Sequence, residues 1–122
     1  MVIVVDDDLQ VREALESLLK SAEFSSVAFS SAEDLLESGS LAEASCVITD
    51  VRMPGMQGLE LQRRINREYP KLPVIVITGH RDEQTRQRAL AEGAAVVLYK
   101  PLDPNDLFHA LYSAMSDSEK DI

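Results

Sequence analysis

The sequence has little cysteine and no long apolar run, and each absence narrows what the protein can be. Its one cysteine, Cys46, lies within an apolar run, which indicates a small buried side chain rather than a redox or metal site. No apolar stretch approaches the ~20 residues needed to cross a bilayer. No basic leader with a cleavage site follows Met1. The sequence therefore predicts a cytoplasmic protein without a membrane contact.

Positive charge is also scarce. The chain has 12 Lys and Arg against 21 Asp and Glu, a formal net charge of -9. Such a surface repels phosphodiester backbones, which argues against direct nucleic-acid binding by this domain. The 122 residues, 45% of them apolar, suffice for one independently folding domain. We expect that domain to occupy residues 1–115, with residues 116–122 as a polar tail or the start of a linker.

Five short apolar runs alternate with helical patterns along the chain. The runs are continuous and rich in β-branched residues, which is typical of parallel strands covered on both faces. Between them, apolar residues recur at the i, i+3, i+4 spacing of amphipathic helices. The expected strands are 2–5, 27–29 (the weakest), 46–48, 74–77 and 96–98, and the expected helices are 11–22, 32–36, 58–65, 82–92 and 107–115.

This order of elements predicts an α/β fold with a doubly wound sheet. Right-handed crossovers arrange five βα units into a five-stranded parallel sheet, for which we expect the strand order 2-1-3-4-5. The helix at 82–92 has Ala89 and Leu90 as its strong apolar anchors. We therefore expect it to be held less firmly than the other helices.

Polar residues follow four of the predicted strands. In an open parallel sheet, ligands bind beyond the carboxyl ends of the strands, so these residues share one edge. Taken singly, an acid after a strand is often a helix cap or a solvated loop residue. Together, three carboxylates, a hydroxyl and an ammonium indicate a functional site. The four segments are Asp6-Asp7-Asp8, Thr49-Asp50, Thr78-Gly79-His80 and Tyr99-Lys100-Pro101.

This combination of groups suits phosphoryl transfer to a carboxylate. Clustered carboxylates repel one another, and a hard divalent cation such as Mg²⁺ relieves that repulsion through oxygen ligands. A carboxylate at such a metal can act as a nucleophile toward phosphorus, and the developing charge needs cationic and hydroxyl partners. Lys100 and Thr78 fit those two partner roles.

Four spaced motifs give the chain a specific resemblance to a known family. They are Val4-Val5-Asp6-Asp7, residues 48–58 (ITDVRMPGMQG), Ile77-Thr78-Gly79 and Lys100-Pro101. In these motifs the sequence resembles the CheY-like receiver domains of two-component response regulators. Arg52-Met53-Pro54 and Thr78-Gly79-His80 resemble the FixJ-like subgroup in particular. The resemblance extends from residue 2 to about residue 115 and implies a flavodoxin/CheY-like (βα)5 fold.

The resemblance implies that Asp50 accepts a phosphoryl group from a sensor histidine kinase in a Mg²⁺-dependent reaction. The metal would be held by Asp6, Asp7, Asp50 and the backbone carbonyl of Arg52. Such a domain is a phosphorelay switch rather than an enzyme, because it catalyses only its own phosphorylation and dephosphorylation. It would change a partner or output surface, and the FixJ-like subgroup suggests that this output regulates transcription.

The family also implies roles for the last two strand ends. Lys100, joined to Pro101 by a cis bond, would pair with the phosphoryl oxygens, and Thr78 would swing its hydroxyl toward them. Many receivers carry a large aromatic residue three positions before the lysine, whose rotation accompanies the threonine movement; this chain has Val97 there. Tyr99 shares the strand face of Val97, either as part of an interaction surface or as a half-exposed strand residue. We expect the last helix-strand-helix face to support a homodimer.

A few polar residues near these motifs have two interpretations. Asp8 is either a spare site acid or, as we favour, the cap of the helix beginning near Leu9. Arg52 and His80 lie where hydrolytic water would approach and could tune the phosphoryl lifetime, but His80 is equally consistent with an exposed loop imidazole. We interpret His109 as a surface residue of the last helix.

Other classes of protein fit the sequence less well. A haloacid-dehalogenase-type phosphatase would have an acid two residues after the nucleophile, where this chain has Arg52, and would need room for a cap domain. A receiver in shape alone would have lost an acid or the lysine. A flavodoxin-type cofactor site would need a Ser/Thr/Gly-rich loop after the first strand, and no Walker-type Gly-x-x-x-x-Gly-Lys is present.

Overall fold

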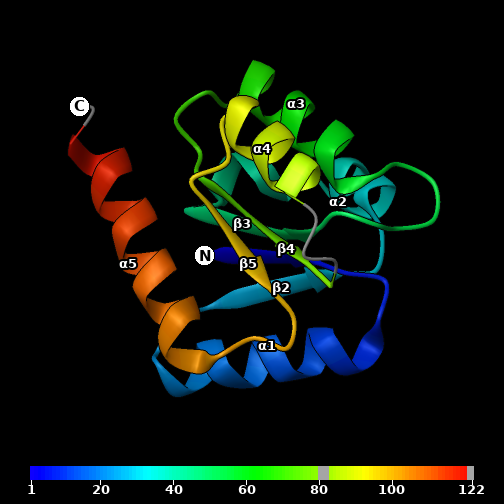
Figure 1. The fold of residues 1–122 in the computed structure, drawn as a ribbon. Helices are drawn as coiled ribbons and strands as arrows, with labels where there is room; N and C mark the ends of the chain where they lie inside the picture. The colour runs from blue at the N-terminus through cyan, green and yellow to red at the C-terminus, as the bar shows by residue number, and fades with distance from the viewer. Residues whose placement is uncertain (80–82, 121–122) are drawn as a thin grey trace.

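The computed structural model describes residues 1–79 and 83–120, and forms a five-stranded parallel sheet between two layers of helices (Figure 1). The strand order is β2-β1-β3-β4-β5, which confirms the predicted doubly wound topology. β1 lies between β2 and β3 in register, with Val5 opposite both Phe29 and Thr49. The strands are β1 (Val2–Val5), β2 (Ser26–Phe29), β3 (Cys46–Asp50), β4 (Val74–Thr78) and β5 (Val96–Tyr99).

The helices cover both faces of the sheet. α2, α3 and α4 lie on one face, and α1 and α5 lie on the other (Figure 1). Their bounds are α1 Leu9–Ser21, α2 Ala32–Ser38, α3 Gly58–Glu68, α4 Glu83–Ala91 and α5 Pro104–Lys120. Among the described residues, no helix is both long and apolar enough to cross a bilayer.

The core is built from the alternation of side chains along the strands. In β3, Cys46 and Ile48 pack toward α1 and α5, whereas Val47 packs toward α2 and α3. All residues of β1, β3 and β4 are buried, which explains why these strands are continuous apolar runs rather than alternating ones. Each fully buried Leu or Ile contributes about 1.5–3 kcal/mol through removal from water. The prediction that Cys46 is a small buried side chain is confirmed.

Local capping explains where the first helix begins. The Asp8 carboxylate accepts a hydrogen bond from the Gln10 backbone N–H at 2.9 Å, which confirms the cap interpretation of Asp8. Asp8 leaves Asp6 and Asp7 as the two acids between β1 and α1 that are free of the capping role. Asp6 and Asp7 are therefore the two acids of this segment that remain available for a site at the carboxyl edge of the sheet.

Two details differ from the sequence-based expectation, and a third cannot be compared with it. A short 3-10 helix, Ser40–Glu43, precedes β3 and has too few residues to give a periodic pattern. Helix α5 extends to Lys120, five residues beyond the helical pattern expected at 107–115, and includes part of the segment expected as a polar tail. These five residues contain neither Gly nor Pro, so nothing in them ends the helix. Asp82, the expected first residue of the fourth helix, lies outside the described residues, as does His80.

Candidate functional site

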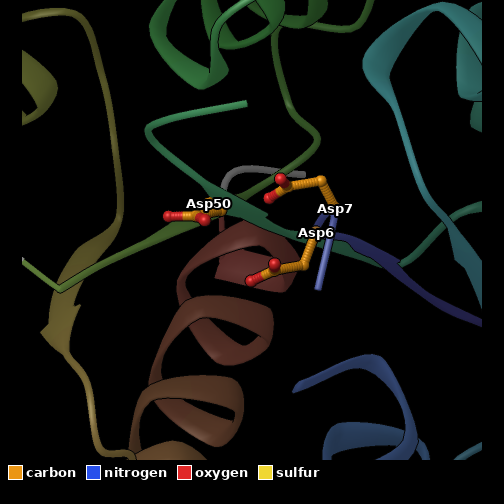
Figure 2. A group of neighbouring side chains, drawn as sticks. All are labelled: Asp6, Asp7 and Asp50. Atoms are coloured by element: carbon orange, nitrogen blue, oxygen red, sulfur yellow. The ribbon is translucent and has the colours of Figure 1, made fainter. Parts of the chain in front are cut away.

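The structure brings three acids from two neighbouring strands together. Because β1 and β3 are adjacent and parallel, Asp6 and Asp7, directly after β1, lie beside Asp50 at the end of β3. One carboxylate oxygen from each of the three lies within 4.8 Å of those from the other two. Figure 2 shows the three carboxylates gathered beyond the strand ends. Asp6 is fully buried and Asp50 nearly so, whereas Asp7 is exposed.

Lys100 reaches the same cluster from the end of β5. Its ammonium nitrogen lies 3.0 Å from Asp6 Oδ2 and 3.1 Å from Asp50 Oδ2. The Lys100 backbone N–H donates to the Thr78 carbonyl at 2.9 Å, which connects the ends of β4 and β5. The Lys100–Pro101 peptide bond is cis, as the family resemblance implies. One cation thus bridges two carboxylates that would otherwise face each other without compensation.

Asp6 is the most constrained of the three acids. Its Oδ1 accepts a hydrogen bond from the Asp8 N–H at 2.9 Å, and its backbone carbonyl accepts one from Arg12 Nη1 at 2.8 Å. Its buried Oδ2 makes the ion pair with Lys100 but has no hydrogen bond from any described residue. An oxygen in this position is suited to ligate a hard cation.

The charges of the site shift two pKa values. Burial and the negative charge of Asp6 raise the pKa of Asp50 above its ordinary value, although Lys100 acts in the opposite direction. Burial lowers the pKa of Lys100, but its close contacts with the Asp6 and Asp50 carboxylates and the attraction of their negative charges outweigh that effect and raise the pKa overall. Three carboxylates with one ammonium leave an excess of negative charge. The donor set of Asp6, Asp7 and Asp50 therefore fits an oxygen-ligated divalent cation such as Mg²⁺.

Thr78 lies at the end of β4, buried and paired in the sheet with Tyr99. It is therefore at the same edge as Asp50 and Lys100. The Arg52 side chain is exposed, two residues past Asp50, and His109 is exposed on α5, which confirms its interpretation as a surface residue.

Sequence reasoning missed the residues that hold the loop after Asp50. Glu33, on α2, accepts a hydrogen bond from the Met56 N–H at 3.1 Å. Gln57 bonds to both backbone groups of Met53, donating to its carbonyl at 2.8 Å and accepting from its N–H at 3.3 Å. These side chains lie on polar helix and loop positions that resemble ordinary solvated ones, so a single sequence gives no signal for them.

Gly58 also fixes this loop, and here the sequence does contain a signal. Its N–H donates to the Val51 carbonyl at 2.8 Å. A Cβ at position 58 would lie 2.0 Å from the Asp50 carbonyl oxygen, so only glycine allows the start of α3 to approach the end of β3 this closely. A glycine at the start of a helix, eight residues after a strand-end acid, is the pattern that could have indicated this contact.

Comparison with known proteins agrees with this geometry. Residues 2–112 match the response regulator receiver domain family, and the chain belongs to it. It is 38% identical over 120 residues to nodulation protein W of Bradyrhizobium diazoefficiens, covering 98% of this chain and 53% of that protein. It is 39% identical over 115 residues to the transcriptional regulatory protein FixJ of Azorhizobium caulinodans, covering 94% of this chain and 54% of that protein.

Solved structures give the same result for the fold. The crystal structure of a response regulator receiver domain protein from Clostridium thermocellum superposes with a TM-score of 0.93 at 28% identity, covering 99% of this chain and 98% of that one. The CheY-like fold and the FixJ-like resemblance predicted from the sequence are therefore confirmed. The chain spans about half the length of the two curated relatives.

Proposed function

We propose that this receiver domain is a phosphorylation switch in which Asp50 accepts a phosphoryl group from a sensor histidine kinase. The observation that supports it most strongly is the Lys100 ammonium, 3.1 Å from Asp50 Oδ2 and 3.0 Å from Asp6 Oδ2. A cation that contacts the proposed nucleophile on one side and a proposed metal ligand on the other is placed to pair with the oxygens of a phosphoryl group. A structural ion pair would not require a third acid, Asp7, within 4.8 Å.

In the proposed reaction, an Asp50 carboxylate oxygen attacks phosphorus as the bond from phosphorus to the donor histidine nitrogen breaks. The imidazole leaves with the bonding electron pair. Mg²⁺, held by Asp6, Asp7, Asp50 and the Arg52 carbonyl, would supply charge neutralisation to the transferred group. Lys100 would keep its contact with Asp6 and turn its second contact to a phosphoryl oxygen, and Thr78 would donate its hydroxyl to another.

The same residues argue for a switch rather than a turnover enzyme. A phosphatase of this chemistry needs a second acid to protonate the leaving group and then activate water. Arg52 occupies the position two residues after Asp50, and its side chain is exposed. The aspartyl phosphate would therefore persist long enough to be read by a partner, and one phosphoryl group per molecule is the expected product.

The relatives suggest what the switch controls. One of them is named a transcriptional regulatory protein, so we propose that the phosphorylated domain acts in transcription control through an output domain or a partner. We place this activity in the cytoplasm, with the α4-β5-α5 face as a homodimer surface and without direct nucleic-acid contact by this domain. The net charge of -9 supports the last point.

The test is incubation with acetyl phosphate and Mg²⁺, followed by intact-mass measurement. Wild type should gain one phosphoryl group, and Asp50→Asn should gain none. Asp8→Asn is the matched control, because it removes a neighbouring charge while asparagine still caps α1. It should be phosphorylated like wild type. Equal phosphorylation of the Asp50→Asn variant, or none in wild type, would refute the proposal.

A further inference from the structure

Helix α4 has unusually little apolar attachment to the rest of the domain. Of its nine residues, all of them described, Ala89 is the buried one. Leu90 is 37% exposed. Near its beginning, Glu83 accepts hydrogen bonds from Arg86 and Gln87, both within the helix. Apolar packing alone therefore does not explain how α4 is held against the sheet.

The C-terminal end of α4 is held instead by polar side chains of α3. Gln62, which is fully buried, donates from Nε2 to the Ala89 carbonyl at 2.9 Å. Arg63 donates to both carboxylate oxygens of Glu92, from Nε at 2.7 Å and from Nη2 at 2.5 Å. Asn66 donates from Nδ2 to the Glu92 carbonyl. We call Gln62, Arg63 and Asn66 the α3 clasp.

The end of α4 does not need the clasp to satisfy its hydrogen bonds. The Ala94 N–H already donates to the Ala89 carbonyl at 3.0 Å, and the Gly93 N–H donates to the Leu90 carbonyl at 3.1 Å. Gly93 has φ of +100°, so these bonds form a Schellman motif with glycine in the left-handed region. The Gln62 amide is a second donor to a carbonyl that already has one.

Gln62 is also less favourable for the stability of the fold than an apolar side chain would be. Its Oε1 is buried and has no hydrogen bond from any described residue. A buried amide that satisfies one of its two ends is less favourable than an apolar side chain of similar shape. We therefore attribute a positional role to Gln62, because its amide holds the end of α4 through the hydrogen bond to the Ala89 carbonyl.

We propose that the α3 clasp fixes the C-terminal end of α4 as a pivot, so that switching at Asp50 moves the Glu83 end of the helix and leaves the Glu92 end in place. Gln62, Arg63 and Asn66 are then positioning residues for the output surface. The pivot itself stands on the geometry of the unphosphorylated domain. The movement about it rests on the proposed function.

The pivot is tested by amide hydrogen exchange on the unphosphorylated protein. In the double variant Gln62→Met/Asn66→Ala, exchange in residues 89–94 should become about tenfold faster, as expected for the loss of two hydrogen bonds. Exchange in β4 should not change. Arg64→Ala is the matched control, because Arg64 pairs with Glu68 within α3 and should leave α4 unaffected. Unchanged exchange in residues 89–94 would overturn the proposal, and so would an equal increase in β4.

A single Gln62→Met variant separates positioning from stability. It should unfold at the same urea concentration as wild type or a higher one, because the half-satisfied amide is gone, while residues 89–94 exchange faster. A lower urea midpoint in proportion to the faster exchange would show that Gln62 is merely structural. That result would overturn its role as a positioning residue.

The movement is tested with beryllofluoride and Mg²⁺, which mimic the aspartyl phosphate. In wild type, exchange should change in residues 83–88 and not in residues 89–94. In the double variant, the change should extend through residue 94. Equal changes in both halves of wild-type α4 would contradict the pivot. If acetyl phosphate adds no mass to Asp50, the proposed function fails, and the exchange experiment on the unphosphorylated protein still decides whether the clasp exists.

Discussion

Replacing Asp50 with asparagine should stabilise the metal-free protein at neutral pH, although it removes the group on which the proposed function depends. At an effective dielectric constant of about 20, two carboxylate oxygens within 4.8 Å of each other repel by at least about 3 kcal/mol, and the Lys100 contact at 3.1 Å contributes an attraction of about 5 kcal/mol. Repulsion from Asp6 and the exposed Asp7 thus roughly cancels the attraction. The desolvation cost of burying the charged Asp50 carboxylate then remains, and a neutral asparagine does not have this cost.

The pKa of Asp50 gives the direction of the pH dependence. Because the pKa is raised in the folded state, folding favours the protonated form. The contribution of Asp50 to stability is present below its unfolded pKa and is lost as pH rises through the folded one. Asp50→Asn and wild type should therefore be similarly stable near pH 3, and the variant should be more stable at pH 7 by about 1–2 kcal/mol.

Urea unfolding followed by circular dichroism in EDTA measures this difference, since the chain has no tryptophan for fluorescence. Added Mg²⁺ should reduce the gap, because a cation that binds the wild-type site stabilises only the folded wild type. Asp34→Asn, an exposed acid on α2, is the control and should show neither effect. An Asp50→Asn variant that is less stable than wild type at pH 7 would refute this electrostatic reasoning.

Three further predictions concern single residues. Lys100→Met should lower the free energy of unfolding by about 2 kcal/mol, which is less than the loss from breaking a fully buried ion pair because the Lys100 side chain is 24% exposed. Mg²⁺ should restore part of this loss, as measured by urea unfolding. Gly58→Ala should lower the unfolding free energy by about 2–3 kcal/mol through its clash with the Asp50 carbonyl, whereas Gly79→Ala, with no described atom within 4 Å of its Cβ, should change it by less than about 0.5 kcal/mol. Burial raises the pKa of the Cys46 thiol from 9.0 to about 12, so a thiol reagent at pH 8 should label Cys46 only when the protein is unfolded in urea. The stability of the fold should decrease as pH rises above 9. Fast labelling of the native protein would contradict the burial of Cys46.

The sheet and the acidic cluster could be predicted because both follow from strong local signals. Buried parallel strands are continuous β-branched runs, and the residues that end such runs must meet at one edge of the sheet. Asp6, Asp50 and Lys100 were accessible to this reasoning because Asp6 and Lys100 directly follow a strand and Asp50 is the last residue of one. The weakest expected strand, at 27–29, is the half-buried edge strand β2, where burial imposes a weaker pattern.

The supports of the site could not be predicted in the same way. Glu33, Gln57 and Gln62 act through one or two hydrogen bonds to backbone groups that are distant in sequence or lie in a loop. A polar residue on a helix has the same appearance in the sequence whether it faces solvent or a carbonyl of another helix. The extension of α5 was missed for a related reason, since residues 116–120 are polar and apolar periodicity ends before them.

The central claim is that Asp6, Asp7 and Asp50, together with the Arg52 carbonyl, surround one divalent cation. Crystals grown with Mn²⁺ in place of Mg²⁺ test it directly through anomalous scattering. We expect one strong anomalous peak within ligand distance of the three carboxylates and the carbonyl, and no peak there in Asp50→Asn crystals. A peak elsewhere on the surface, or an equally strong peak at the site in the variant, would contradict the account.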